Sequence, residues 1–229
     1  HYHFTCHLPG SISFFSSNTL KLFFSGIKID PDQLNALKNI PENAIVVYAT
    51  KFKSHFEFLF SYIRYRENKL PFPEIGFDYK VFIWQPVPRI LRTLLSYLDY
   101  YFQNKSFPDP YKSGYIKDEL LSGKSAFLSL VEDKAFYRRF VKSETDPLSY
   151  LVELQKITER PVYIIPQIMS FGKNPMRTTP SLTDIIFGTP DNPGRLRKIA
   201  TLFKYPEKII VEISEPINLK QIIESEEMK

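Results

Sequence analysis

Short runs of β-branched and aromatic residues alternate with helical patterns along most of this chain, and this alternation limits the folds open to it. The runs at 44–49, 80–84, 126–131, 162–165 and 209–213 have the length and composition of buried strands. Strands separated by helical patterns favour an α/β fold. We therefore expect a mixed, partly parallel central sheet flanked by helices.

Helix start and stop signals separate these runs. Asp30 before Pro31 predicts an N-cap, and Ser54 followed by Glu57 has the spacing of a capping box that opens a helix. Further helices are expected at 89–98, at 114–121 with Gly123 as the stop, and after Asp146, where Leu148, Leu151 and Val152 share a face. The segment 56–62 is apolar nearly all round, which predicts burial or contact with lipid.

Composition excludes several classes of protein. The chain has only 8 glycines and no G-x-G or G-K-[ST] motif, so the usual nucleotide phosphate loops are absent. Cys6 is the only cysteine and cannot form an internal disulfide. A net charge of +5 from scattered basic residues permits an anionic lipid or acidic small molecule and gives no reason to expect nucleic acid. No apolar run reaches the length of about 18 residues that a membrane span needs.

The chain divides into three parts in this interpretation. Residues 1–43 form an N-terminal segment that we expect to be the end of a longer region, 44–218 form the main domain, and 219–229 form a tail. The Pro- and Gly-rich stretch 171–193 predicts a long excursion of the kind that often serves as a lid or binding surface. The basic cluster Arg195, Arg197 and Lys198 is expected to be a solvated helix face.

Histidine is scarce, and its positions narrow the search for chemistry. His1, His3 and His7 crowd around Cys6, but no second cluster completes a metal cage, so no metal site is expected. His55 follows a predicted strand directly, where ligands bind in open α/β sheets. A structural role for His55 and a functional one are both open, and Glu57 could serve as its partner or only complete the capping box.

Four segments in order resemble the motifs of glycerol-3-phosphate acyltransferases and related phospholipid/glycerol acyltransferases. Residues 47–57 (VYATKFKSHFE) are similar to the family's H-R-S-H-x-D motif after a V-Y strand. Leu130-Val131-Glu132 with Arg138 and Arg139 resembles the third motif, F-x-E-G-x-R-S. Residues 164–168 and 211–217 resemble the fourth motif and the closing G-E-P-I strand, so that the resemblance covers about 44–218.

The sequence also departs from that pattern. Phe52 stands where the family has its catalytic His, and Glu57 stands where it has Asp. Residues 100–104 keep the aromatic strand character of the second motif without its Gly and Arg. Asp133 and Lys134 replace the glycines of the third motif.

The resemblance implies transfer of a fatty acyl group from acyl-CoA or acyl-carrier protein to glycerol 3-phosphate or lysophosphatidate in phospholipid synthesis. It implies a peripheral protein at the cytoplasmic membrane surface, with no cofactor beyond the acyl donor. His55 would replace the family's base and Glu57 would orient it. Lys53, Glu132, Arg138 and Arg139 would bind the substrate. Two alternatives stay open: a degenerate domain that binds lipid or acyl chains without turnover, and a soluble scaffold.

Overall fold

A computed structural model describes residues 4–8, 14–131, 145–171 and 209–227. Within these ranges six strands form one sheet: β1 (Ile45–Phe52), β2 (Pro73–Gly76), β3 (Ser125–Val131), β4 (Val162–Phe171), β5 (Ile209–Ile213) and β6 (Ile217–Asn218). The main strands follow the order β2-β3-β1-β4-β5, and β6 pairs with β4. Strands β2, β3, β1 and β4 are parallel, whereas β5 and β6 run antiparallel to β4. The predicted fold class, α/β with a mixed, partly parallel sheet, is confirmed.

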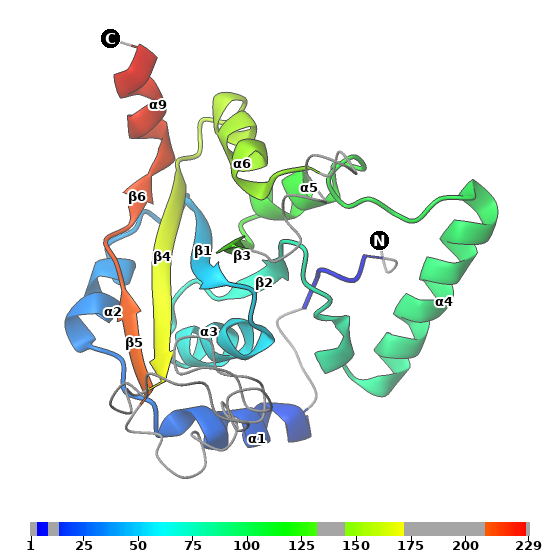
Figure 1. The fold of residues 1–229 in the computed structure, drawn as a ribbon, viewed down its shortest axis with the longest axis horizontal. Coiled ribbons are helices and arrows are strands. Elements are labelled where there is room, and N and C mark those ends of the chain that lie inside the picture. Colours follow the sequence, from blue (N-terminus) through cyan, green and yellow to red (C-terminus); the bar gives the residue numbers. More distant parts are fainter. Residues whose placement is uncertain (1–3, 9–13, 132–144, 172–208, 228–229) are drawn as a thin grey trace, which may run out of the picture.

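Helices cover both faces of this sheet (Figure 1). They are α1 (Phe14–Ser25), α2 (Pro31–Lys38), α3 (His55–Glu67), α4 (Val87–Asn104), α5 (Tyr115–Leu121), α6 (Pro147–Lys156) and α9 (Leu219–Glu227). Val46 and Tyr48 of β1 pack into a core with side chains of α1, α2 and α3. Ile45 and Val47 pack on the opposite face with α5 and α6. Alternate residues of a strand point to opposite faces, so the wholly apolar 45–49 run supplies both cores.

The local signals of the sequence explain where the helices begin. Asp30 caps α2 by accepting a hydrogen bond from the Asp32 amide at 2.9 Å, and Asp146 caps α6 through the Ser149 amide at 2.9 Å. Ser54 caps α3 by accepting from the Glu57 amide at 3.4 Å. Gly123 has φ +100°, the left-handed conformation that favours glycine after a helix end. The apolar segment of α3 is buried in the core.

Two predictions about residues 80–104 are wrong. Residues 80–84 are not a strand but lead into a short 3₁₀ helix, η1 (Phe82–Trp84). The outer edge of β2 pairs with the segment 4–8, in which the Cys6 carbonyl accepts from Gly76 at 2.8 Å, so no strand edge is left there for 80–84. The aromatic run 100–104, expected to have strand character, forms the last turn of α4, whose apolar residues recur at helical spacing.

The segment 4–8 covers the free side of β2. The Leu8 amide donates to the Glu74 carbonyl at 2.7 Å, and the amide of Val81 donates to the Thr5 carbonyl at 2.9 Å. Cys6 is buried there, and burial raises the pKa of its thiol to about 12. The segment therefore adds an antiparallel partner to the four-residue strand β2.

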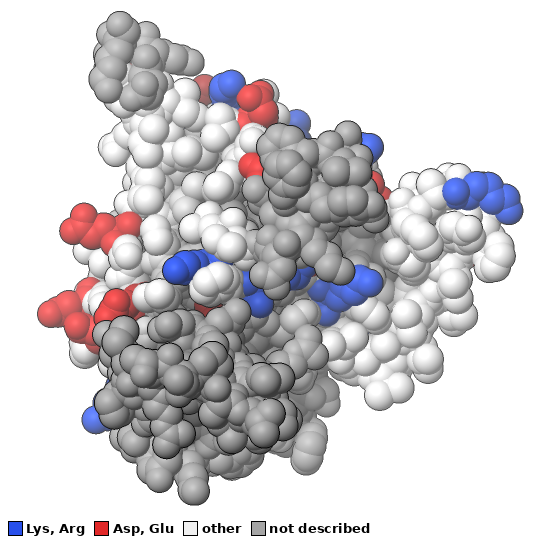
Figure 2. Space-filling view, in the orientation of Figure 1, with Lys and Arg blue, Asp and Glu red and all other residues white. Residues whose placement is uncertain are grey.

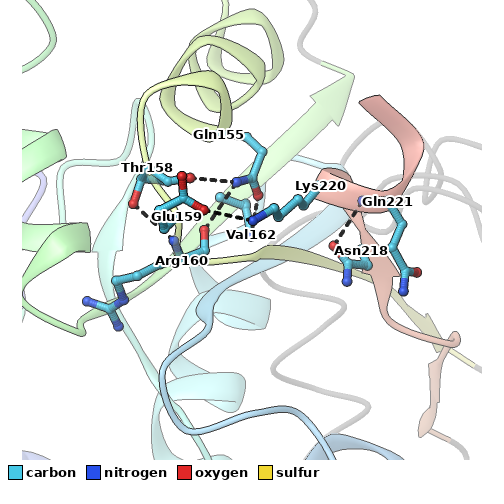
Figure 3. Close-up of polar contacts among 8 residues, drawn as sticks. All are labelled: Gln155, Thr158, Glu159, Arg160, Val162, Asn218, Lys220 and Gln221. Carbon is cyan, nitrogen blue, oxygen red and sulfur yellow. Dashed lines mark hydrogen bonds and ion pairs between the residues drawn. The ribbon is translucent and has the colours of Figure 1, made fainter. Parts of the chain in front are cut away.

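The loop before β4 is fixed by polar contacts at the amino end of that strand (Figure 3). Gln155 donates to the carbonyls of Thr158 and Arg160 at 3.1 and 3.2 Å, and accepts from the Val162 amide at 2.6 Å. Arg160 donates through Nε to the Asn43 carbonyl at 2.6 Å. Lys220 of α9 pairs with Glu159 at 3.0 Å. These contacts fix the loop at the amino ends of the parallel strands β1 and β4.

Two sequence features fall outside the described residues: the excursion after Phe171, up to 193, and the basic cluster at Arg195, Arg197 and Lys198. Leu148 of α6 is exposed, whereas Leu151 is fully buried, so the apolar face expected on this helix is narrower than its sequence suggests. No helix within the described parts of the chain has both the length and the apolar character to cross a bilayer.

Candidate active site

Polar side chains lie in register where the parallel strands approach their carboxyl ends. Thr50 of β1 is paired with Ser129 of β3 on one side and with Gln167 of β4 on the other. Thr50 is fully buried, and its hydroxyl donates to the carbonyls of Phe52 and Leu128 at 3.2 and 3.4 Å. Gln167 donates to Ser61 at 2.8 Å and accepts from Tyr65 at 2.7 Å, which joins the strand end to α3. Ligands bind at this end of open α/β sheets.

His55 is the first residue of α3, directly after the turn that leaves β1. Ser54 fixes this start as the N-cap. The position places His55 at the helix end where backbone amides carry partial positive charge, which disfavours an imidazolium and favours anions. The ring of His55 is partly buried and contacts the Tyr79 ring edge-on, with centroids 5.4 Å apart.

Tyr79 is the central residue of this site, because it contacts Ser54, His55 and Lys53. Its hydroxyl accepts from the Ser54 amide at 3.2 Å, and its ring stacks with Phe58 at 5.8 Å and meets Phe127 at 5.7 Å. Burial raises the pKa of Tyr79 well above its ordinary value; nearby hydrogen-bonding groups at Ser54, Thr50 and Ser129 oppose this shift. The phenol therefore stays neutral at any physiological pH.

Gly76 makes room for Tyr79. A Cβ at Gly76 would lie 2.7 Å from the Tyr79 Cβ and 3.2 Å from its Cγ. Tyr79 could not be identified from the sequence, because an aromatic residue after a strand is ordinary core composition. The lone glycine before an aromatic pair was the available signal of a close approach.

Lys53 and Glu57 bring opposite charges to the same place. The Lys53 ammonium lies over the Tyr79 ring, 5.6 Å from its centroid, and Glu57 is buried near enough to the Tyr79 phenol to raise its pKa. A cation over an aromatic face is attracted by the ring quadrupole. Figure 2 shows Lys and Arg side chains gathered across the middle of this face of the molecule.

The structure thus brings Lys53, His55 and Glu57 of the sequence prediction to one strand–helix junction. His55 and Glu57 are two residues apart, so their side chains leave a helix about 200° apart. Tyr79 is the neighbour that they share. Phe52 ends β1 opposite Val131, with the Lys51 ammonium 5.0 Å from its ring centroid. Glu132, Arg138 and Arg139 lie outside the described residues.

The histidines near the N-terminus behave differently. His7 is paired with Tyr115, whose hydroxyl lies 2.7 Å from the His7 Nδ1. Burial and the nearby Lys124 lower the pKa of His7 to about 4. Within the described ranges no group of His, Cys, Asp and Glu side chains is arranged to hold a metal ion. His1 and His3 fall outside those ranges.

The chain matches a known protein family. The family model of the glycerol-3-phosphate acyltransferase PlsB N-terminal domain matches residues 91–229. The match starts within α4 and includes β3, β4, β5 and α9. It does not include β1 or α3, and His55 is the first residue of α3. No curated protein and no solved structure gives a significant match to the chain.

Proposed function

Because the chain belongs to the glycerol-3-phosphate acyltransferase PlsB N-terminal domain family, we propose that it transfers a fatty acyl group from an acyl thioester to glycerol 3-phosphate or lysophosphatidate. The acyl donor is acyl-CoA or acyl-carrier protein, and no other cofactor takes part. The reaction belongs to phospholipid synthesis and takes place at the cytoplasmic surface of a membrane.

In this proposal His55 acts as the general base. Its imidazole takes the proton of the acceptor hydroxyl while the oxygen attacks the thioester carbonyl. The C–S bond then breaks, and the imidazolium returns the proton to the departing sulfur, so that an ester and a free thiol result. Tyr79 holds the His55 ring from one side. Glu57 is buried beside the same Tyr79 phenol, and we propose that its carboxylate stabilises the imidazolium charge from there, across the shared tyrosine.

The observation that carries the proposal is the placement of His55 and Lys53 together at the N-terminus of α3, at the carboxyl end of parallel strands. Both the helix terminus and the ammonium attract a phosphate, so an acceptor bound there would bring its hydroxyl to the histidine. Arg138 and Arg139 are proposed as further phosphate contacts, and Glu132 as a substrate-binding residue.

A second candidate function is a domain that binds acyl chains or lipid without turnover. Phe52 supports it, because a phenyl ring cannot accept a proton and stands where the resemblance expects the base. The two functions differ in whether thiol is released from the donor.

The test is release of free thiol from acyl-CoA and from acyl-carrier protein in the presence of glycerol 3-phosphate. We expect the wild-type chain to release thiol and His55→Ala to lose about 10²–10⁴-fold of that rate, the range for removal of a general base. His7→Gln is the matched control, since it also removes a histidine and lies against Tyr115.

The control variant should keep the wild-type rate once circular dichroism shows that it is folded. An unchanged rate in His55→Ala would show that another group is the base. Absence of turnover with both donors, together with saturable binding of a fluorescent acyl-CoA analogue, would favour the second candidate function.

A further inference from the structure

Helix α4 exposes a continuous apolar surface that the rest of the described chain does not cover. The side chains of this apolar stripe are each between 38% and 67% exposed: Val87, Leu91, Leu94, Leu95, Leu98, Tyr101 and Phe102. Figure 1 shows α4 standing away from the sheet and its flanking helices. Helix α3 is similarly rich in aromatic residues, yet its apolar side chains are buried. The contrast shows that no other described element of the fold packs against the apolar side of α4.

The apolar stripe continues beyond the helix. Phe107 is also exposed, and its ring stacks on Tyr97 and Tyr101 with centroids 5.4 and 4.8 Å apart. Ile83 of η1, which precedes α4, is likewise exposed. Exposed apolar patches of this extent mark interaction sites.

The charges of α4 lie outside the stripe. Arg92 lies beside it, Lys105 follows the last turn, Arg89 lies on the opposite side of the helix, and Asp99 is the only acidic residue of the helix. In Figure 2 the outer surface of α4 is largely free of charged atoms, apart from basic ones at its far end. A basic excess next to an apolar stripe is complementary to a bilayer that contains anionic lipid.

The width of the stripe favours a bilayer over a single partner helix. A coiled-coil seam needs apolar residues at only two positions of seven, such as Leu91, Leu94, Leu98 and Tyr101. Here Leu95 and Phe102 widen the stripe on one side. Aromatic side chains with an apolar body and a polar tip, such as Tyr97 and Tyr101, are typical of the membrane interface.

We infer that α4 lies in the plane of an anionic membrane surface with its apolar stripe inserted between the lipids. This inference specifies the membrane contact of the proposed function. It is tested without any acyl donor, so its failure and a failure of the acyl-transfer proposal are separate results.

The experiment is sedimentation of the full chain with vesicles of phosphatidylcholine, with and without phosphatidylglycerol. We expect binding to the anionic vesicles that weakens as salt is raised. Leu95→Glu should weaken this binding by at least tenfold. Gln103→Glu is the matched control, because it adds the same charge to the same helix on an exposed position outside the stripe; it should stay within about threefold of wild type.

Both substitutions are at exposed positions, so neither is expected to unfold the chain. Equal binding by the two variants, or no binding by the wild-type chain, would overturn the inference. Sedimentation velocity without vesicles tests whether a second copy of the chain covers the stripe instead. A wild-type dimer that Leu95→Glu converts to a monomer would show that it does, and would also overturn the inference.

Discussion

At the scale of single residues, the approach of Gly76 to Tyr79 sets a tight steric limit. A methyl group at Gly76 would lie 2.7 Å from the Tyr79 Cβ, in a buried position where neither strand nor ring can move freely. We expect Gly76→Ala to lower the free energy of unfolding by about 1–3 kcal/mol through overpacking. Urea unfolding measures this change.

Gly114→Ala is the control that distinguishes steric crowding of an added Cβ, expected at Gly76, from backbone strain alone. Gly114 has φ +76° but open space around an added Cβ, so only the conformational cost of about 1 kcal/mol applies there. A Gly76→Ala protein as stable as wild type would mean that the Tyr79 ring can shift, and the site would then be less rigid than its packing indicates.

His7 makes stability depend on pH. Its pKa is about 4 in the folded chain against an ordinary value of 6.5, so the unfolded chain binds more protons between these values. The contribution of His7 is complete above about pH 6.5 and is lost as the pH falls toward about 4, by about 1–3 kcal/mol. We expect His7→Gln to flatten the decline in stability between pH 6.5 and 5, followed by urea unfolding. An unchanged slope would show that His7 is not the titrating group.

At the scale of elements, the start of α6 depends on Asp146. Its carboxylate accepts from the Ser149 amide at 2.9 Å and from the Ser149 hydroxyl at 3.1 Å. Asp146→Ala should cost about 1 kcal/mol of stability, the usual value of an N-cap. Glu153→Ala, which breaks only an exposed pair with Lys156 in the same helix, should change stability by less than about 0.5 kcal/mol. Equal effects in thermal unfolding would contradict the assignment of the cap.

Elements with local signals could be predicted, and those decided by distant contacts could not. The caps at Asp30, Ser54 and Asp146 are readable because donor and acceptor are within three residues. The run 80–84 has strand composition, but a strand needs a free edge, and the segment 4–8 occupies the one beside β2. Composition therefore predicts a strand at 80–84, where the chain forms a short 3₁₀ helix.

At the scale of the whole molecule, the candidate site joins residues from several strands. Its strand–helix junction was predictable, because Lys53, His55 and Glu57 are neighbours in sequence. The row formed by Ser129, Thr50 and Gln167 depends on strand register across two crossovers, and Tyr79 reaches the junction from beyond β2. No periodicity in the sequence carries that information, so these partners of the site emerge only from the fold.

The segment 4–8 has a consequence for self-association. A parallel sheet with an uncovered outermost strand offers a row of amides and carbonyls to any other chain, and proteins avoid such templates for aggregation. Here β2 is only four residues long, begins with a proline, and has its outer amides and carbonyls engaged by Cys6 and Leu8. Residues 4–8 thus protect this edge of the sheet from pairing with a strand of another chain, a role separate from any chemistry at the carboxyl ends of the strands.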